Sequence, residues 1–571
     1  MGLFPGLQLP YKSVNMALDS EMATCPKIPN QQPYQSNPPS NRTRNAYINS
    51  VTHKPADHSN SVGSTPRQFQ GAISLDCGTF RVPKDYTSAN STETIELHLA
   101  RVPALTSPSK GSIQFNFGGP GEPGRSGLAS LSQVLQVLTN GEYDLVAFDP
   151  RGTVNTLPFN CIDNEVEAAQ TLVQTPLGNA SDAAVGSLWA QGKVIGEKCK
   201  AKLKETGELV GTAFTARDLM QVAEVLEEDG LLRYWGLSYG TTLGATVAAM
   251  FPDRIEKMVL DGVQNPHEYF HALANFQEWT VSDEVFSAIF TGCKAAPENC
   301  TLASDNRTAA ELEQRTWDLL DQVKREPLVV AGTMIDYTLL KGYIQSALYS
   351  LYSWPGVTTA LDLIFKNETD ALAELLTDMT GSSTSKTSVE LLSSMTSVYG
   401  IQCGDRTARA STLDEFVPAV EELYSISRIS GDGTVSSMAA CAQWPYSAKE
   451  RYEGDFHVKT KNPVLILGNT GDAFTPLVSA YNLSSTFEGS VVLEIDGYGH
   501  ASTSVPSSCS WKHISAFWQS STLPQSGTLC PAEAQPFNNV TWADVFAAAN
   551  SSSAGASKRG VHAASKMKFV D

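Results

Sequence analysis

Residues 231–251 read LLRYWGLSYGTTLGATVAAMF. The apolar and aromatic run Leu231–Trp235 is followed by Gly236-Leu237-Ser238-Tyr239-Gly240, and then by Thr241–Phe251, in which apolar residues recur at helical spacing. Gly-x-Ser-x-Gly between a strand and a helix is typical of a nucleophile elbow, a sharp turn that lifts the serine hydroxyl out of a sheet and needs small neighbours. The stretch therefore predicts a buried strand with Ser238 as a candidate nucleophile at its carboxyl end.

Further short apolar runs flank this stretch and alternate with helical segments, which is the pattern of a mostly parallel sheet. Helices are expected over residues 217–229 and 241–251. The clearest expected strands are Ser112–Phe117, Asp144–Phe148, Leu232–Trp235, Lys257–Leu260, Val464–Leu467 and Val491–Ile495. The sequence thus predicts an α/β fold with a mostly parallel central sheet.

The strand series is interrupted from about Asn265 to Asn462, where long amphipathic segments such as 308–325, 336–351 and 410–427 dominate. We expect this part to form a helical cap inserted between core strands six and seven. The predicted organisation is a disordered lead-in, the first part of the core, the cap, the C-terminal part of the core and a disordered tail, over residues 1–68, 69–264, 265–460, 461–549 and 550–571.

Composition excludes some classes of function. The 571 residues carry 41 Lys+Arg against 60 Asp+Glu, a net charge of −19, so no basic surface is expected for nucleic acid or for an anionic membrane. No apolar run approaches the roughly 18 residues of a spanning helix. We therefore expect no nucleic-acid partner and no membrane partner.

The cysteines and the glycosylation motifs bear on the cellular compartment. None of the ten Cys lies in a Cys-x-x-Cys pair, the spacing typical of structural zinc sites and redox sites, so neither kind of site is indicated. Asn-x-Ser/Thr acceptor motifs occur at Asn41, Asn90, Asn179, Asn299, Asn306, Asn367, Asn482, Asn539 and Asn550. Met1–Lys12, however, has Pro5 and Pro10 in place of an apolar signal core. The interpretation is a secreted protein, with a cytoplasmic location as the alternative.

A serine nucleophile needs a base and a group that orients the base, and on this scaffold they follow in the order Ser, acid, His. His500 alone among the downstream histidines lies just beyond a predicted strand end, in a glycine-rich loop. Asp472 follows the preceding predicted strand and is the first candidate for the acid. Asp261, at the end of another strand, is the rival, and Asp496 is a weaker third candidate.

The oxyanion of an acyl intermediate also needs donors. The expected donors are the backbone N–H groups of Tyr239, directly after the nucleophile, and of Gly119 in the loop Gly118–Gly121 after the third strand. Residues 119–124 also match Gly-x-Gly-x-x-Gly, but Pro120 and Pro123 remove amides that a pyrophosphate would use. No organic cofactor and no metal is therefore expected.

These residues, in this order, resemble the secreted tripeptidyl-aminopeptidase-like α/β hydrolases, which are akin to prolyl aminopeptidases. The resemblance spans roughly residues 72–532 and rests on Val82–Tyr86, Gly118–Gly121, Phe148–Gly152, the elbow, Phe251–Arg254, Val259–Gly262, Gly468–Asp472, Gly497–His500 and Gly527–Cys530. It implies the α/β-hydrolase fold and a Ser238–Asp472–His500 hydrolase that releases a residue or a short peptide from an N-terminus. It also implies the disulfides Cys161–Cys199, Cys293–Cys300, Cys403–Cys441 and Cys509–Cys530, leaving Cys25 and Cys77.

Two segments depart from the pattern of this family. Glu122-Pro123 interrupts the oxyanion loop, and Thr153–Thr156 replaces the usual small residues after Arg151-Gly152. Glu122 is a candidate partner for the free amine of a substrate. An exopeptidase further predicts acidic side chains in the cap that pair with this amine, the candidates being Glu268, Glu278 and Asp283.

Three functions are compatible with these residues. The first is a serine exopeptidase acting on peptides, and the second is an esterase or other hydrolase of a small acyl molecule, since both reactions use one acyl-enzyme route. The third is a non-catalytic binding protein on a hydrolase fold, which is disfavoured because all three triad positions are occupied. The substrate, the cleavage register and the oligomeric state are not encoded in these motifs.

Overall fold

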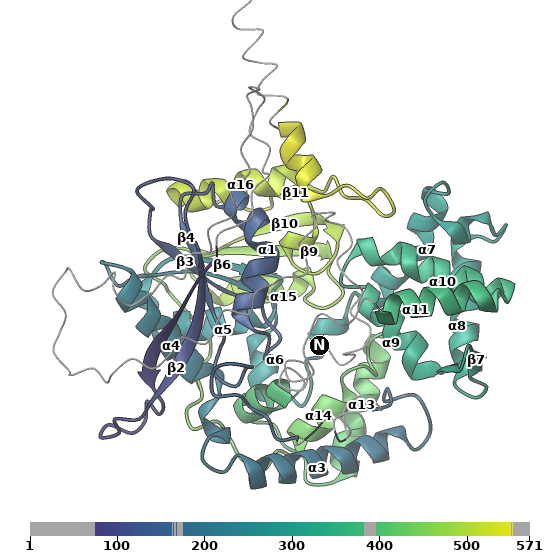
Figure 1. The fold of residues 1–571 in the computed structure, drawn as a ribbon, viewed down its shortest axis with the longest axis horizontal. Coiled ribbons are helices and arrows are strands. Elements are labelled where there is room, and N and C mark those ends of the chain that lie inside the picture. The colour runs from purple at the N-terminus through teal and green to yellow at the C-terminus, as the bar shows by residue number, and fades with distance from the viewer. Residues whose placement is uncertain are drawn as a thin grey trace, which may run out of the picture.

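The computed structural model describes residues 75–162, 164, 167, 175–381, 396–549 and 551. At its centre is a nine-stranded sheet in the order β1-β2-β4-β3-β5-β6-β9-β10-β11 (Figure 1). The strands are β1 (Asp76–Pro83), β2 (Thr94–Val102), β3 (Ser112–Asn116), β4 (Asp144–Phe148), β5 (Leu232–Leu237), β6 (Ile255–Asp261), β9 (Leu465–Gly471), β10 (Val491–Tyr498) and β11 (Leu529–Pro531). Strand β2 runs antiparallel to both of its neighbours, and the other pairs are parallel. The predicted α/β fold is confirmed.

Helices cover both faces of the sheet because successive strand residues point to opposite sides. In β4, Val146 and Phe148 belong to one apolar cluster and Leu145 and Ala147 to another. The first cluster is covered by α4 (Thr212–Leu226), α5 (Tyr239–Met250) and α15 (Leu477–Thr486). The second is covered by α1 (Gly124–Leu138) and α16 (Ser508–Ser520).

The chain between β6 and β9 forms the predicted helical insertion, which lies beside the sheet and below it in Figure 1. Its longer elements are α6 (Pro266–His271), α7 (Ser282–Ala295), α8 (Ala309–Val323), the hairpin β7 (Leu328–Val330) and β8 (Thr333–Ile335), α9 (Tyr337–Ala347), α10 (Trp354–Lys366), α11 (Thr369–Gly381), α13 (Leu413–Ile426) and α14 (Val435–Ala442). The small hairpin was not predicted. The apolar cluster inside the insertion also includes Ala473 and Phe474 from the loop after β9, so the insertion packs directly on that loop.

Helix α3 (Ala184–Lys202) precedes β5 in the sequence but packs against α14 of the insertion. The contact is close, since a Cβ atom on Gly192 would lie 2.7 Å from the backbone of Ala439 and Ala440. Figure 1 shows α3 beside α13 and α14. The helical region beside the sheet is thus built from two separate stretches of the chain, namely the insertion and α3.

The sequence predicted the central strands well and the helix ends less well. Helix α4 starts at Thr212, five residues before the predicted start, because its first turn is held by tertiary hydrogen bonds described below. Strands β1 and β2 were not among the clearest expected strands, since both carry exposed polar residues. The predicted lead-in and all of the predicted tail except Ser551 lie outside the described residues.

All four predicted disulfides are present, which confirms the pairs Cys161–Cys199, Cys293–Cys300, Cys403–Cys441 and Cys509–Cys530. Cys77 is disulfide-bonded as well, and Cys25 lies outside the described residues. Among the helices that the structure describes, none has the length and apolar character needed to cross a bilayer.

Candidate active site

Ser238 occupies the tip of a sharp turn between β5 and α5. Its backbone has φ 57° and ψ −128°, a conformation that a non-glycine residue adopts only when its surroundings enforce it. The flanking glycines allow this approach: a Cβ atom on Gly240 would lie 2.5 Å from the Asn116 carbonyl oxygen, and one on Gly236 would meet the Gly240 carbonyl. The predicted elbow geometry is therefore present, and the side chain of Ser238 is 7% exposed.

Asp472 follows β9 directly and is fully buried. Its carboxylate accepts hydrogen bonds from the backbone N–H groups of Phe474, Thr475 and Ala501 at 2.9–3.0 Å, and from the Thr475 hydroxyl at 2.7 Å. Burial opposes its ionisation, but the His500 charge and these donors outweigh burial and lower the pKa of Asp472. Asp472 is therefore an ionised carboxylate inside the protein.

His500 lies in the loop after β10. Its Nδ1 atom is 3.1 Å from each carboxylate oxygen of Asp472 and 3.0 Å from the Thr475 hydroxyl. The loop is held from the insertion, because the His500 N–H donates to the Tyr349 carbonyl at 2.9 Å and the Tyr349 ring stands edge-on to the imidazole. Burial lowers the pKa of His500, but Asp472 more than compensates, so the pKa is raised above its usual value.

Asp261, the rival acid, connects the serine turn to the histidine loop. Its backbone carbonyl accepts the Ser238 N–H at 3.0 Å, while its carboxylate accepts from the N–H and the hydroxyl of Ser502 at 2.7 and 2.6 Å. The structure thus brings Asp472 and His500 into contact and holds Ser238 at the same rim of the sheet. Within the described residues no hydrogen bond joins Ser238 to His500; in free enzymes such bonds are often long and tighten only with substrate.

The loop after β3 borders the serine. A Cβ atom on Gly118 would lie 2.8 Å from the Ser238 Cβ and 3.3 Å from its Oγ, and Gly118 and Gly119 have φ values of +100° and +103° that favour glycine. Tyr239, the other expected donor, begins α5, and its side chain is buried. Gly118 thus closely approaches Ser238, and its N–H donates to the Asn116 side-chain oxygen at 3.1 Å. Gly119, the predicted oxyanion donor, is the next residue of the same loop.

The four acidic candidates differ in their surroundings. Glu278 is 1% exposed, accepts from Gln264 at 2.5 Å and from Asn275 at 2.8 Å, and burial raises its pKa to about 7. Burial is the main cause of the raised pKa of Tyr349, and the charges of Glu278, Asp472 and Glu122 add to it. The Glu278 charge also adds to the effect of Asp472 on the pKa of His500. Trp279, the residue after Glu278, packs edge-on against Phe474, whose ring stacks on Tyr349, so the Glu278 segment packs against the same loop as the histidine.

The other two acidic candidates hold the backbone. Glu268 accepts the Gln277 N–H at 2.8 Å. Asp283 accepts from the Ser427 hydroxyl and from the N–H groups of Arg428 and Ile429. Asp496, the third candidate for the triad acid, accepts from Thr470 at the surface.

Sequence reasoning missed two residues of the site. Thr475 donates to Asp472 and contacts His500, and the only available signal was its position three residues after an acid in a loop. Tyr349 lies just after α9, more than a hundred residues from either loop, and no local pattern could have shown that it contacts His500. The single grouping of metal-type ligands among the described residues is Cys509, His513 and Cys530, whose two sulfurs are joined in a disulfide.

The sheet order, the strained serine turn and the buried acid–histidine pair define an α/β hydrolase. Residues 427–530 match a family model described as TAP-like protein. The chain is 28% identical over 466 residues to serine protease Hip1 of Mycobacterium tuberculosis, covering 80% of this chain and 87% of that protein. It is 26% identical over 491 residues to a tripeptidyl aminopeptidase of Streptomyces lividans, covering 81% and 84%, and 26% identical over 479 residues to carboxylesterase B of M. tuberculosis, covering 80% and 86%.

These comparisons confirm the resemblance to the tripeptidyl-aminopeptidase-like hydrolases. The protein is a serine hydrolase of the α/β-hydrolase fold.

Proposed function

We propose that the protein is a serine exopeptidase that releases a residue or a short peptide from a free N-terminus, with Ser238, His500 and Asp472 as its triad. Asp472 accepts the Nδ1 proton of His500 and so leaves Nε2 free to take the proton of the Ser238 hydroxyl as Oγ attacks the acyl carbon. The resulting imidazolium returns this proton to the leaving amine, and water then repeats the cycle on the acyl-enzyme.

The proposed oxyanion donors are the backbone N–H groups of Tyr239 and Gly119, since the Gly118 N–H donates to the Asn116 side-chain oxygen at 3.1 Å. Donors held in a fixed geometry stabilise the negative charge that develops in the transition state. Loss of one such donor typically lowers kcat by about 10²–10³. The close approach of the neighbouring Gly118 to Ser238 supports Gly119 as the loop donor.

The observation that carries the exopeptidase proposal is the burial of Glu278 in the segment that packs through Trp279 and Phe474 against Tyr349. A carboxylate in this place stabilises an ammonium group and disfavours a neutral or acylated N-terminus, since burial without a charged partner is costly. Glu122, on the oxyanion loop, is a second candidate for the same ammonium group. The relatives named as serine protease and tripeptidyl aminopeptidase support peptide substrates.

The test compares peptidyl-aminocoumarins that have free or acetylated N-termini. The wild type is expected to cleave the free form at least 100-fold faster, and Ser238→Ala to lose both activity and labelling by a fluorophosphonate probe. Glu278→Gln is expected to raise KM for the free form about 10–100-fold, the worth of a hydrogen bond to a charged group. Glu268→Gln, at a carboxylate that binds backbone, is the matched control. Equal turnover of both substrates would exclude the exopeptidase.

A second candidate function is hydrolysis of carboxylic esters. It is favoured by the similarity to carboxylesterase B and by Glu122-Pro123 in the oxyanion loop. Turnover of a small acyl ester together with no turnover of any peptide would establish it in place of the first.

We also infer that the protein functions in an oxidising, secretory compartment. Four disulfides support this, as does the exposure of Asn90, Asn179, Asn299, Asn306, Asn367, Asn482 and Asn539, the acceptor residues among those the structure describes.

A further inference from the structure

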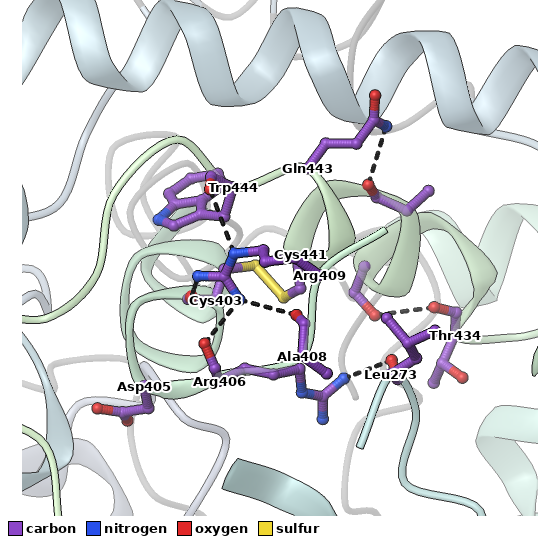
Figure 2. Close-up of a disulfide and its surroundings, with 12 residues drawn as sticks. Leu273, Cys403, Asp405, Arg406, Ala408, Arg409, Thr434, Cys441, Gln443 and Trp444 are labelled. Carbon is purple, nitrogen blue, oxygen red and sulfur yellow. Dashed lines mark hydrogen bonds between the residues drawn. A yellow bond between two sulfur atoms is a disulfide. The ribbon is translucent and has the colours of Figure 1, made fainter. Parts of the chain in front are cut away.

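One short segment of the insertion, Cys403–Arg409, contacts the surroundings of the active site at two places. It follows the helical turn Tyr399–Cys403 and is tied to α14 by the Cys403–Cys441 disulfide (Figure 2). The Arg409 guanidinium closes the segment by donating to the carbonyls of Cys403, Arg406, Ala408 and Trp444. In Figure 2 the side chains of Asp405 and Arg406 leave this braced segment in different directions.

Asp405 reaches the nucleophile turn through Thr212. The fully buried carboxylate accepts from the Thr212 N–H at 3.0 Å, from the Thr212 hydroxyl at 2.6 Å and from the Tyr269 hydroxyl at 3.0 Å. The Thr212 oxygen is also 2.6 Å from the Tyr239 hydroxyl. Because the single hydroxyl proton of Thr212 goes to Asp405, the Tyr239 hydroxyl must donate to Thr212. The side chain of the proposed oxyanion residue is thereby held from the insertion.

Arg406 reaches Glu278 through Asn275. The buried guanidinium donates to the carbonyls of Tyr269 at 3.1 Å and Leu273 at 2.8 Å, and to the side-chain oxygen of Asn275. The Asn275 amide nitrogen then donates to Glu278 at 2.8 Å. This contact also fixes the orientation of the amide, since its oxygen must face the guanidinium and its nitrogen the carboxylate.

We propose that Asp405 and Arg406 are paired positioning residues: Asp405 holds the oxyanion hole through Thr212 and Tyr239, and Arg406 holds the amine-binding carboxylate Glu278 through Asn275. The proposal rests on the function proposed above. Under this proposal, variants can affect the oxyanion hole and the amine-binding carboxylate separately. One chain of hydrogen bonds acts on the reacting carbonyl, and the other acts on the N-terminus of the substrate. Small displacements of such groups have large kinetic effects.

The first test uses the pair Thr212→Val and Thr212→Ser, with active sites counted by fluorophosphonate labelling. Valine keeps the shape and removes the hydroxyl, so kcat per labelled site is expected to fall about tenfold with KM within twofold. Serine keeps the hydroxyl and is expected to restore kcat to within twofold of the wild type. Tyr239→Phe, which leaves the bonds to Asp405 intact, is expected to lower kcat about threefold to fivefold.

A merely structural role would lower the melting temperature and the fraction of labelled sites while kcat per site stayed that of the wild type. That result in both Thr212→Val and Tyr239→Phe would overturn the assignment of Asp405. Absence of labelling in the wild type would instead overturn the proposed function itself, so the two failures are distinguishable.

The second test uses Asn275→Asp, which keeps an acceptor for Arg406 but removes the donor to Glu278. KM for free-amine peptides is expected to rise about tenfold, while kcat/KM for a small acyl ester without an amine stays within twofold. Equal losses on both substrates would overturn the assignment of Arg406.

Discussion

At the scale of single residues, two buried carboxylates at neighbouring strand ends have different partners. Asp472 hydrogen-bonds His500, whereas Asp261 accepts from Ser502 and from the Trp235 indole at 3.2 Å, and burial raises the pKa of Asp261 to about 6. Because both residues lie at the carboxyl end of a strand, strand position alone left both as candidates for the acid of the triad. Only the loop conformations after β9 and β10 separate them.

The pKa shifts at the site predict the pH dependence of activity. In the proposed mechanism His500 must be neutral to accept a proton, and its pKa is raised above 6.5, so kcat is expected to fall as the pH drops through that raised value. In the proposed function Glu278, whose pKa burial raises to about 7, binds an ammonium only when ionised, so KM should rise below pH 7. Rate profiles from pH 5 to 9 measure both effects.

Asp472→Asn is the matched variant for this profile. Loss of the carboxylate removes the main cause of the raised His500 pKa, so the fall of kcat on the acid side of the profile is expected to move to lower pH. The value of kcat itself is expected to fall about 10⁴-fold. An unchanged acid limb would show that another group controls it.

At the scale of elements, the serine turn depends on how closely β3, β5 and α5 approach one another. A side chain at Gly240 would collide with the backbone of Asn116, which cannot move without disturbing the sheet. The start of α4 is set in a similar way by contacts from outside the helix, since Thr212 is bonded to Asp405, 193 residues away.

Gly240→Ala is therefore expected to lower the free energy of unfolding by about 3 kcal/mol. Gly186→Ala is the control, because Gly186 lies in a helix with no atom within 4 Å of an added Cβ. There the expected change is a gain of about 0.5 kcal/mol. Urea unfolding of both variants gives the comparison, and equal effects would contradict the packing argument.

At the scale of the whole molecule, the insertion and the sheet domain meet at the proposed active site. The insertion supplies Tyr349, Glu278 and Asp405, and the sheet supplies Ser238 and the acid and histidine loops. The Cys403–Cys441 disulfide fastens the part of the insertion that contacts the site, whereas Cys293–Cys300 closes a short loop after α7.

Removal of these two disulfides is expected to have unequal effects. The bonded residues are 38 apart in Cys403–Cys441 and 7 apart in Cys293–Cys300. Chain entropy then predicts losses of about 4 and about 2 kcal/mol of unfolding free energy for the paired Cys→Ala variants. Only the first variant should also lower kcat/KM for peptides at 25 °C, and denaturant titrations with parallel assays check both expectations.

The sequence by itself determined the elements whose signal is local. Gly236–Gly240 between a strand and a helix, the order of apolar runs, and the change to amphipathic segments after Asn265 led to the fold and to Ser238, Asp472 and His500 as candidates. These signals suffice because strand and helix periodicity and turn chemistry depend on neighbours within a few residues.

Only the tertiary structure decided which candidates meet. The bond between Asp472 and His500, the burial of Glu278 and the connection from Asp405 through Thr212 to Tyr239 depend on chain segments far apart in the sequence. A hydrogen bond across such a distance leaves no periodic trace, because its geometry arises from how the layers pack and not from the residues beside each partner.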